Sequence, residues 1–189
     1  MKIVLASGSE RRQELLKRIV EDFIIKVSDF DEASIIYKGD PKEYVEELSK
    51  GKGEAVSKEV SPDSIIISAD TIVVYEKEIL LKPKDSEDAF KMLKMLSGKT
   101  HKVYTGVTVL NNRTLKSITK SFITEVKFSK LDESDIIKYI ESKDPLDKAG
   151  AYGIQGNAAV FVEGISGCYY NVVGLPLNGL SKMLKEILK

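Results

Sequence analysis

The chain has 189 residues, of which 29 are basic and 29 acidic, so its formal net charge is zero. This balance argues against a protein that coats nucleic acid without sequence preference and against one that binds membranes through a polybasic surface. The single cysteine, Cys168, excludes an internal disulfide framework, and the single histidine, His101, excludes a metal site built from several histidines. No apolar run reaches membrane length. Composition therefore predicts a cytoplasmic protein with one sizeable domain, or two small lobes that share a core.

The first predicted elements are a short strand over residues 2–6 and the turn Ser7-Gly8-Ser9. Ser9 is a typical helix N-cap and predicts a helix over residues 10–19. Arg11 and Arg12 would lie in its first turn, where the helix dipole disfavours cations. An anion held by backbone N–H groups and the two guanidinium groups would explain them. A solvated charged face is the alternative, and this segment alone does not favour either.

Acidic residues follow a second predicted strand, residues 23–27. The loop over residues 28–34 contains Glu32, and such loop acids are usually only solvated. If they were brought near another carboxylate, they would form the oxygen-rich site that Mg²⁺ or Mn²⁺ prefers. Asp40-Pro41 then begins a helix that continues toward Pro62, because a capping acid is followed by a proline in the first turn.

Residues 64–75 form a nearly continuous run of β-branched apolar residues, which predicts a strand buried on both faces. Asp70 interrupts this run. A buried carboxylate costs several kcal/mol unless it is paired, bound to metal or open to a cleft. Asp70 is therefore a candidate functional residue; the alternative is that it ends the strand or bonds a nearby amide.

The rest of the chain predicts further helices and strands around this central one. We expect a hairpin over residues 73–81, a helix over 86–96 capped by Ser86, long strands over 102–110 and 114–128 joined at Asn111-Asn112, a helix from Asp132 with Ile136, Ile137 and Ile140 inward, a strand over 158–162, a glycine-rich loop over 163–175 and a helix from Pro176. These elements predict an α/β fold with a mixed central sheet flanked by helices, in two lobes with a cleft between them.

Three glycines recur at intervals of three in Asp147-Lys-Ala-Gly-Ala-Tyr-Gly-Ile-Gln-Gly156. Their spacing matches neither a dinucleotide fingerprint nor a P-loop. It indicates a backbone that turns tightly or closely approaches another group.

Six motifs, in this order along the chain, resemble the Maf family of nucleoside triphosphate pyrophosphatases. They are Leu5-Ala-Ser-Gly-Ser-x-Arg-Arg-x-Glu-Leu-Leu16, Ala69-Asp-Thr-Ile-Val73, Lys82-Pro83, Leu96-Ser-Gly-x-Thr-His101 with Val103, Thr105 and Gly106, the segment 147–156, and Asn171-Val-x-Gly-Leu-Pro176. The resemblance covers residues 3–177. Two positions depart from the family pattern: Glu10 replaces its usual proline, and Gly53 replaces its usual alanine after Lys52.

This resemblance implies a single Maf-like domain over residues 1–189, with a fold like that of the inosine triphosphate pyrophosphatases. It implies metal-dependent hydrolysis of a nucleoside triphosphate, with Mg²⁺ or Mn²⁺ held by Glu32 and Asp70, and Asp70 activating the water. The implied phosphate contacts are Ser7, Arg11, Arg12, Lys52, Lys82 and Lys148. Arg12, Thr71 and Gln155 are the positions that the resemblance implies for substrate specificity. The sequence of residues 152–156, Tyr-Gly-Ile-Gln-Gly, resembles that of the family members that act on dTTP and UTP.

Several alternatives stay open at this level. The enzyme could act on modified or purine nucleotides, or the chain could be a catalytically idle nucleotide-binding regulator, because the family is also associated with arrest of division and septum formation. A nucleic-acid binder would need a broad basic face, which the zero net charge disfavours. We expect no nucleic-acid or membrane partner, and leave a homodimer open. His101 reads as a structural hydrogen-bonding residue, and Tyr152 as a core residue or a base-stacking one.

Overall fold

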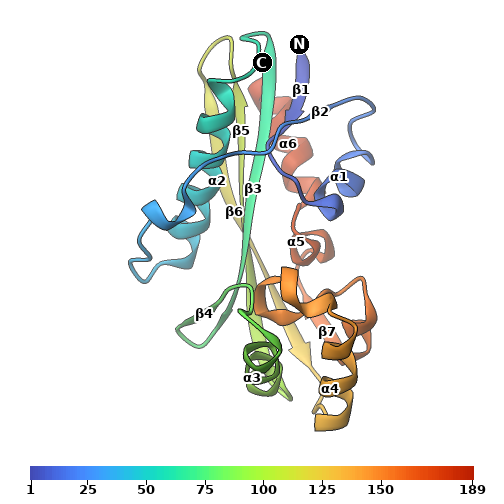
Figure 1. Cartoon of the computed structure of the whole chain (residues 1–189). Helices are drawn as coiled ribbons and strands as arrows, with labels where there is room; N and C mark the ends of the chain where they lie inside the picture. Colours follow the sequence, from blue (N-terminus) through green and yellow to red (C-terminus); the bar gives the residue numbers. More distant parts are fainter. The chain divides into compact units, whose positions relative to one another are not determined.

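The computed structural model describes all residues 1–189 and is an α/β structure with a mixed seven-stranded sheet flanked by helices (Figure 1). The strands pair in the order β2-β1-β3-β5-β6-β7, and β4 pairs with β3. Their bounds are β1 Lys2–Leu5, β2 Ile24–Ile25, β3 Ser64–Tyr75, β4 Glu78–Leu80, β5 Thr100–Asn111, β6 Ser117–Phe128 and β7 Val162–Ser166.

The helices lie between these strands along the chain and after the last strand. Their bounds are α1 Glu10–Leu16, α2 Pro41–Ser57, α3 Ser86–Leu96, α4 Glu133–Glu141, α5 Tyr169–Val173 and α6 Leu177–Ile187, with short 3₁₀ turns η1 Glu32–Ser34, η2 Asp144–Asp147, η3 Ala149–Ala151 and η4 Asn157–Phe161. None of the helices combines the length and the apolar character that a membrane crossing requires. The predicted α/β class with a mixed sheet is therefore confirmed.

The chain divides into two compact units. The first comprises Met1–Asp70, Thr105–Phe122 and Gly174–Lys189, and the second comprises Thr71–Tyr104 and Ile123–Val173. Strands β3, β5 and β6 each contribute one part to the first unit and the other part to the second.

In the first unit, β1 lies parallel to both β2 and β3, with Val4 opposite Ile24 on one side and Ile66 on the other. Helix α2 lies on one face of these strands, and α1 and α6 lie on the opposite face (Figure 1). Both faces of β3 are therefore covered, which is why its apolar run is nearly continuous. A core cluster of this unit comprises Val4, Ala6, Val56, Ile66 and Leu110.

Helix α2 begins where the sequence predicts, because the Asp40 carboxylate accepts a hydrogen bond from the Lys42 amide (2.9 Å) and Pro41 follows it. Its backbone approaches β5 so closely that a Cβ on Gly106 would lie 2.0 Å from the Val45 carbonyl oxygen. A Cβ on Gly53 would lie 2.8 Å from Ser68 Oγ. Gly106 therefore lets β5 pack directly on the backbone of α2, and Gly53 lets the Ser68 side chain of β3 approach the backbone of α2.

In the second unit, β3 continues into an antiparallel pairing with β4, and β6 pairs antiparallel with β7. Helices α3 and α4 pack against each other. The rings of His101, Phe128 and Tyr152 meet edge to face, with centroids 4.8–5.3 Å apart. Tyr152 is 5% exposed, so it belongs to the core, and its hydroxyl pairs with His101 Nε2 (2.8 Å), as expected for a structural histidine.

Some predicted details are wrong. Asp85, not Ser86, caps α3, because the Asp85 carboxylate accepts a hydrogen bond from the Asp88 amide (2.9 Å). Ile137 is 49% exposed, because the buried face of α4 is formed by Ile136 and Tyr139. Residues 158–162 are mostly a 3₁₀ turn rather than a strand, and residues 163–175 contain β7 and α5 rather than an irregular loop. Ala158 and Phe161 are buried three residues apart, which is the spacing of a 3₁₀ turn.

Candidate active site

The central carboxylate of the first unit is Asp70, which is 8% exposed on β3. Side chains alternate along a strand, so Ser68 and Asp70 point to the same face. Both bond to α2: Ser68 Oγ donates to the Ser49 carbonyl (2.6 Å), and Lys52 Nζ donates to Asp70 Oδ1 (2.5 Å). The strand and the helix therefore bring a buried carboxylate and a half-buried lysine ammonium group into direct contact.

A second carboxylate, that of Glu32, contacts the same ammonium group. Asp31 caps the 3₁₀ turn η1 by accepting a hydrogen bond from the Ala33 amide (3.1 Å). Glu32 Oε1 lies 2.9 Å from Lys52 Nζ. The Glu32 side chain is 59% exposed, against 12% for that of Asp70, so Lys52 bridges an inner and an outer carboxylate.

Arg12 reaches the same region from α1. Its Nε donates to the Gly174 carbonyl (2.9 Å), and its Nη1 donates to Ser7 Oγ (3.3 Å). Ser9 is the N-cap of α1, as predicted, and accepts from the Arg12 amide. Burial lowers the pKa of Arg12, and the negative charge of Asp70 opposes this shift. Arg12 and Ser7 therefore belong to the same cluster as Asp70.

Two neighbours complete the charge distribution around Arg12. The positive charge of Arg11 lowers the Arg12 pKa further, whereas Glu32 acts in the opposite direction. Glu10, the departure from the family pattern, is exposed. Of the predicted site residues, the structure thus groups Ser7, Arg11, Arg12, Glu32, Lys52 and Asp70 in the first unit.

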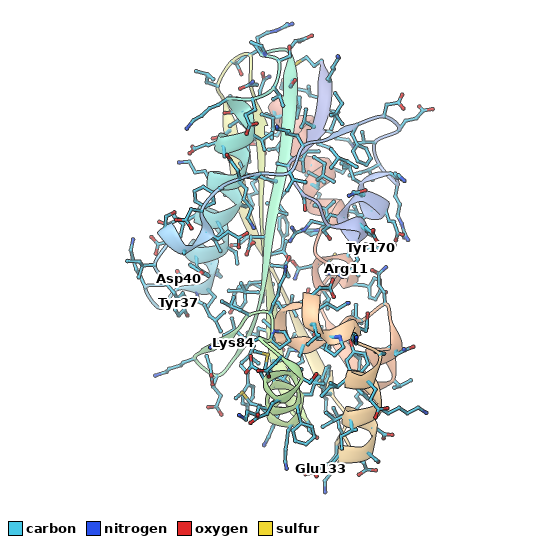
Figure 2. All side chains as sticks on the ribbon, in the orientation of Figure 1. Arg11, Tyr37, Asp40, Lys84, Glu133 and Tyr170 are labelled. Carbon is cyan, nitrogen blue, oxygen red and sulfur yellow. The ribbon has the colours of Figure 1, made fainter.

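Sequence reasoning missed Tyr44, which lies in the first turn of α2. Burial raises the pKa of Tyr44, and the negative charges of Asp70 and Glu32 raise it further. Its ring packs edge to face on Tyr37, with centroids 5.5 Å apart. Tyr37 precedes α2, as does Asp40 (Figure 2). Only the hydroxyl group of Tyr44 could have suggested a role near the carboxylates. In the sequence, Tyr44 fits the apolar pattern of the predicted helix and so does not stand out.

The carboxylates are compatible with a divalent cation. Glu32 and Asp70 both contact one ammonium nitrogen, so their oxygens converge on a single small cationic group. No cluster of three or more His, Cys, Asp or Glu residues suited to a metal is present. Mg²⁺ is typically bound by only one or two carboxylates together with water and substrate phosphates. The donor set therefore fits such an ion bound together with a triphosphate.

The remaining predicted residues belong to the second unit. Thr71 is half-buried, and Lys82 and Gln155 are exposed. Lys148 also belongs to this unit, and its Nζ contacts three oxygens: the Asp144 carbonyl (2.6 Å), Asp144 Oδ1 (2.8 Å) and Asp147 Oδ1 (2.6 Å). Sequence reasoning missed Asp144, although an acid four residues before a lysine is a common pairing signal. Participation of these four residues in one site with the Asp70 cluster stays a prediction.

Comparison with known proteins gives full-length matches. The family model described as Maf-like protein matches residues 2–187. The chain is 56% identical over 186 residues to a Clostridium botulinum (strain Alaska E43) protein named dTTP/UTP pyrophosphatase, covering 98% of this chain and 99% of that protein. Proteins with the same name from Clostridium novyi and Clostridium beijerinckii are 56% and 52% identical; the alignments cover 99% of this chain in both cases, and 98% and 100% of those proteins.

Solved structures of lower sequence similarity share the fold. The Ham1 protein of Staphylococcus aureus matches with a TM-score of 0.56 at 17% identity, over 99% of this chain and 100% of that one. A HAM1 protein of Coxiella burnetii matches with a TM-score of 0.51 at 16% identity, over 98% of this chain and 99% of that one. At these identities the likeness concerns the fold alone.

Proposed function

The chain belongs to the Maf family, and from this premise we propose that it is a nucleoside triphosphate pyrophosphatase that converts dTTP and UTP to the monophosphate and pyrophosphate. The observation that carries the proposal is the identity above one half, over almost the full length, to several proteins named dTTP/UTP pyrophosphatase. The cluster around Asp70 supports it, because a buried carboxylate, a second acid and several cations are the groups that hydrolysis of a phosphoric anhydride requires.

Asp70 is the proposed catalytic residue. Its carboxylate accepts a proton from the attacking water, and general-base catalysis of this kind contributes about 10²–10⁴-fold in rate. The burial of Asp70 supports this role, because a carboxylate on a rigid strand keeps its position. Lys52 bonds the carboxylate through Oδ1, so Oδ2 is the oxygen that we propose accepts the proton.

Glu32 and Asp70 are the proposed ligands of Mg²⁺ or Mn²⁺. Such an ion, when bound, neutralises the charge that develops on the phosphate oxygens. Glu32 is more exposed than Asp70, so Glu32 would hold the ion from the solvent side and Asp70 from the strand side. The preference for Mg²⁺ or Mn²⁺ follows from the all-oxygen donor set.

A triphosphate carries about four negative charges, so the site also needs several cations and hydrogen-bond donors. Ser7, Arg11, Arg12, Lys52 and Lys82 are the proposed phosphate contacts. The family pattern implies Lys148 as a sixth, but its Nζ already contacts three protein oxygens. Arg12 is anchored at Nε by the Gly174 carbonyl, which orients its planar guanidinium group. An oriented guanidinium group binds two phosphate oxygens at once.

Arg12, Thr71 and Gln155 are the proposed determinants of substrate choice. The Gln155 amide offers an acceptor and donors side by side, which complements the N3–H and O4 of uracil and thymine. Cytosine presents the opposite pattern at these positions. A site that pairs its own polar groups with one base rejects a base that leaves them unpaired.

Pyrophosphate release with Mg²⁺ or Mn²⁺, measured in parallel for dTTP, UTP, CTP, ATP and 7-methylguanosine triphosphate, tests the proposal. We expect dTTP and UTP to be hydrolysed fastest. Faster turnover of 7-methylguanosine triphosphate than of dTTP would contradict the proposed substrate, and binding of nucleotide without any pyrophosphate release would instead support an idle regulator. A homodimer, a cytoplasmic location and a role in septum formation stay predictions.

A further inference from the structure

The segment over residues 148–156 carries Gln155, and this inference rests on the base-reading role proposed for that residue. Gln155 itself is exposed, whereas Tyr152 is buried in the core of the second unit. Selectivity between uracil and cytosine requires the amide to be presented in a fixed position, because a freely moving glutamine could adapt to either base. The position of the amide therefore depends on the groups that hold the backbone on both sides of Gln155.

Asp144 accepts hydrogen bonds from two elements of the second unit. Tyr139 Oη, on α4, donates to its Oδ2 (2.9 Å). Lys148 Nζ donates to its Oδ1 (2.8 Å) and to its carbonyl oxygen (2.6 Å). The carboxylate therefore links α4 to the first residue of the segment.

Lys148 has no donor left for a phosphate in this arrangement. An ammonium group has three N–H donors, and the third bonds Asp147 Oδ1 (2.6 Å). The Lys148 side chain is only 11% exposed. Binding of a phosphate oxygen would require one of these contacts to break.

The same groups support the two glycines that flank Ile154-Gln155. The Gly153 amide donates to Tyr139 Oη (3.3 Å). A Cβ on Gly153 would lie 2.6 Å from Lys148 Cε, and a Cβ on Gly156 would lie 2.9 Å from Asp144 Oδ2. Both glycines therefore pack directly on the Lys148 stem and the Asp144 carboxylate, which is the close approach that their spacing indicates.

We infer that Tyr139, Asp144 and Lys148 are positioning residues that fix the backbone around Gln155 and thereby contribute to discrimination between uracil or thymine and cytosine. Tyr139 is 4% exposed, so its hydroxyl acts inside the protein and not on the substrate. Lys148 acts mainly through Asp144 and the segment, and not as a direct phosphate ligand. The inference predicts that loss of any one of the three groups changes substrate choice more than it changes phosphate binding.

The test uses Tyr139→Phe, Asp144→Asn and Lys148→Met in the full-length protein, with kcat and KM for dTTP and CTP and with amide hydrogen exchange of residues 153–156. Tyr139→Phe removes one hydroxyl and should speed exchange at Gly153 about tenfold, because its acceptor is lost. All three variants should reduce the ratio of dTTP to CTP kcat/KM by about three- to tenfold. Tyr75→Phe makes the same chemical change elsewhere in the unit and should alter neither quantity.

Two outcomes would overturn the inference. If Lys148→Met raised KM for dTTP and CTP by the same factor while exchange at residues 153–156 stayed unchanged, Lys148 would be a phosphate ligand. If Tyr139→Phe left exchange at Gly153 unchanged, Tyr139 would not hold the segment. The exchange measurement needs no substrate. An unmutated protein that hydrolysed no dTTP would contradict the proposed function, while exchange at Gly153 would still decide whether Tyr139 holds the segment. Should Asp144→Asn not fold, the milder Tyr139→Phe still decides.

Discussion

Lys52 Nζ and Asp70 Oδ1 are 2.5 Å apart, and the two side chains are only 13% and 12% exposed. Most other ion pairs of the molecule lie in solvent, such as Arg113 and Asp63, whose side chains are 63% and 50% exposed, whereas the Lys148–Asp144 pair is also shielded, at 11% and 30%. Exposed pairs contribute little to stability, whereas a shielded pair costs several kcal/mol to desolvate and is weak evidence for stability. A contribution to stability therefore does not by itself account for the Lys52–Asp70 pair, which supports the role proposed for these two residues.

Asp70→Asn should lower turnover of dTTP by at least about 10²–10⁴-fold, because it removes the proposed proton acceptor and a metal ligand while keeping the shape of the side chain. Steady-state kinetics on the folded variant measures this effect. Asp63→Asn, a change at an exposed ion pair, serves as the control and should keep normal kinetics. Turnover close to that of the unmutated protein would remove Asp70 from the mechanism.

Lys52→Met should have opposite effects on metal affinity and on turnover. The ammonium group lies between the two candidate ligands, so its removal should tighten Mn²⁺ binding about tenfold by relieving charge repulsion. Turnover should fall about 10²-fold, because a cation near the phosphates is lost. Calorimetric titration of the substrate-free protein with Mn²⁺ measures the first effect.

Lys50→Met is the matched control for that experiment, because Lys50 is an exposed lysine of the same helix that pairs with Glu54. It should change neither Mn²⁺ affinity nor turnover. Weaker Mn²⁺ binding by Lys52→Met than by the unmutated protein would show that the ammonium group does not compete with the ion.

Arg12→Ala and Lys82→Ala should both weaken turnover but differ in stability. Lys82 is exposed, so Lys82→Ala should leave Tm almost unchanged, with the exposed Lys84→Ala as control. Arg12→Ala leaves the Gly174 carbonyl without its donor, which costs about 1–3 kcal/mol. About 2–4 °C of Tm is lost per kcal/mol in a chain of this size. If Arg12→Ala kept normal kinetics, the role of Arg12 would be purely structural. If Lys82→Ala kept normal kinetics, Lys82 would be only a solvated surface residue.

The effect of Gly53→Ala on the free energy of unfolding should depend on the residue at position 68. Alanine in place of glycine inside a helix contributes about 1 kcal/mol, but the new methyl group would lie 2.8 Å from Ser68 Oγ. This contact disturbs the hydrogen bond from Ser68 to Ser49. In the Ser68→Ala background the full gain should appear, so urea unfolding of the double-mutant cycle should give a coupling of at least about 0.5 kcal/mol. If the effects of the two substitutions on the free energy of unfolding were additive, helix α2 would be able to shift and relieve the contact with Ser68.

His101 should make stability fall in mild acid. Burial lowers its pKa from 6.5 to about 4, so between these values the unfolded chain binds a proton that the folded chain does not. The free energy of unfolding therefore decreases as pH falls from about 6.5 to about 4, by at most about 1.4 kcal/mol per pH unit from this residue. The decrease should be smaller in His101→Leu/Tyr152→Phe than in Tyr152→Phe. Equal slopes would show that His101 binds a proton in the folded state.

Local signals predicted much of this fold. The bounds of β3 match the apolar run between Pro62 and Glu76, and the Asp40-Pro41 pair correctly predicts the start of α2. Periodicity failed at residues 158–162, because a five-residue apolar run is too short to separate a strand from a turn. The types of the site residues were visible in the sequence, but their partners were not. The contact of Lys52 with Glu32 depends on the fold of the short turn η1, and no local pattern predicts it.

The hydrogen bond between Arg12 Nε and the Gly174 carbonyl joins residues that are 162 positions apart. During synthesis, Arg12 leaves the ribosome early and has no such anchor until residue 174 has also emerged. The first unit likewise needs Gly174–Lys189 together with Met1–Asp70. A nascent chain that has not yet reached residue 174 thus contains Ser7, Arg12 and Asp70 without the contact that orients Arg12, so the proposed nucleotide site would be incomplete in it.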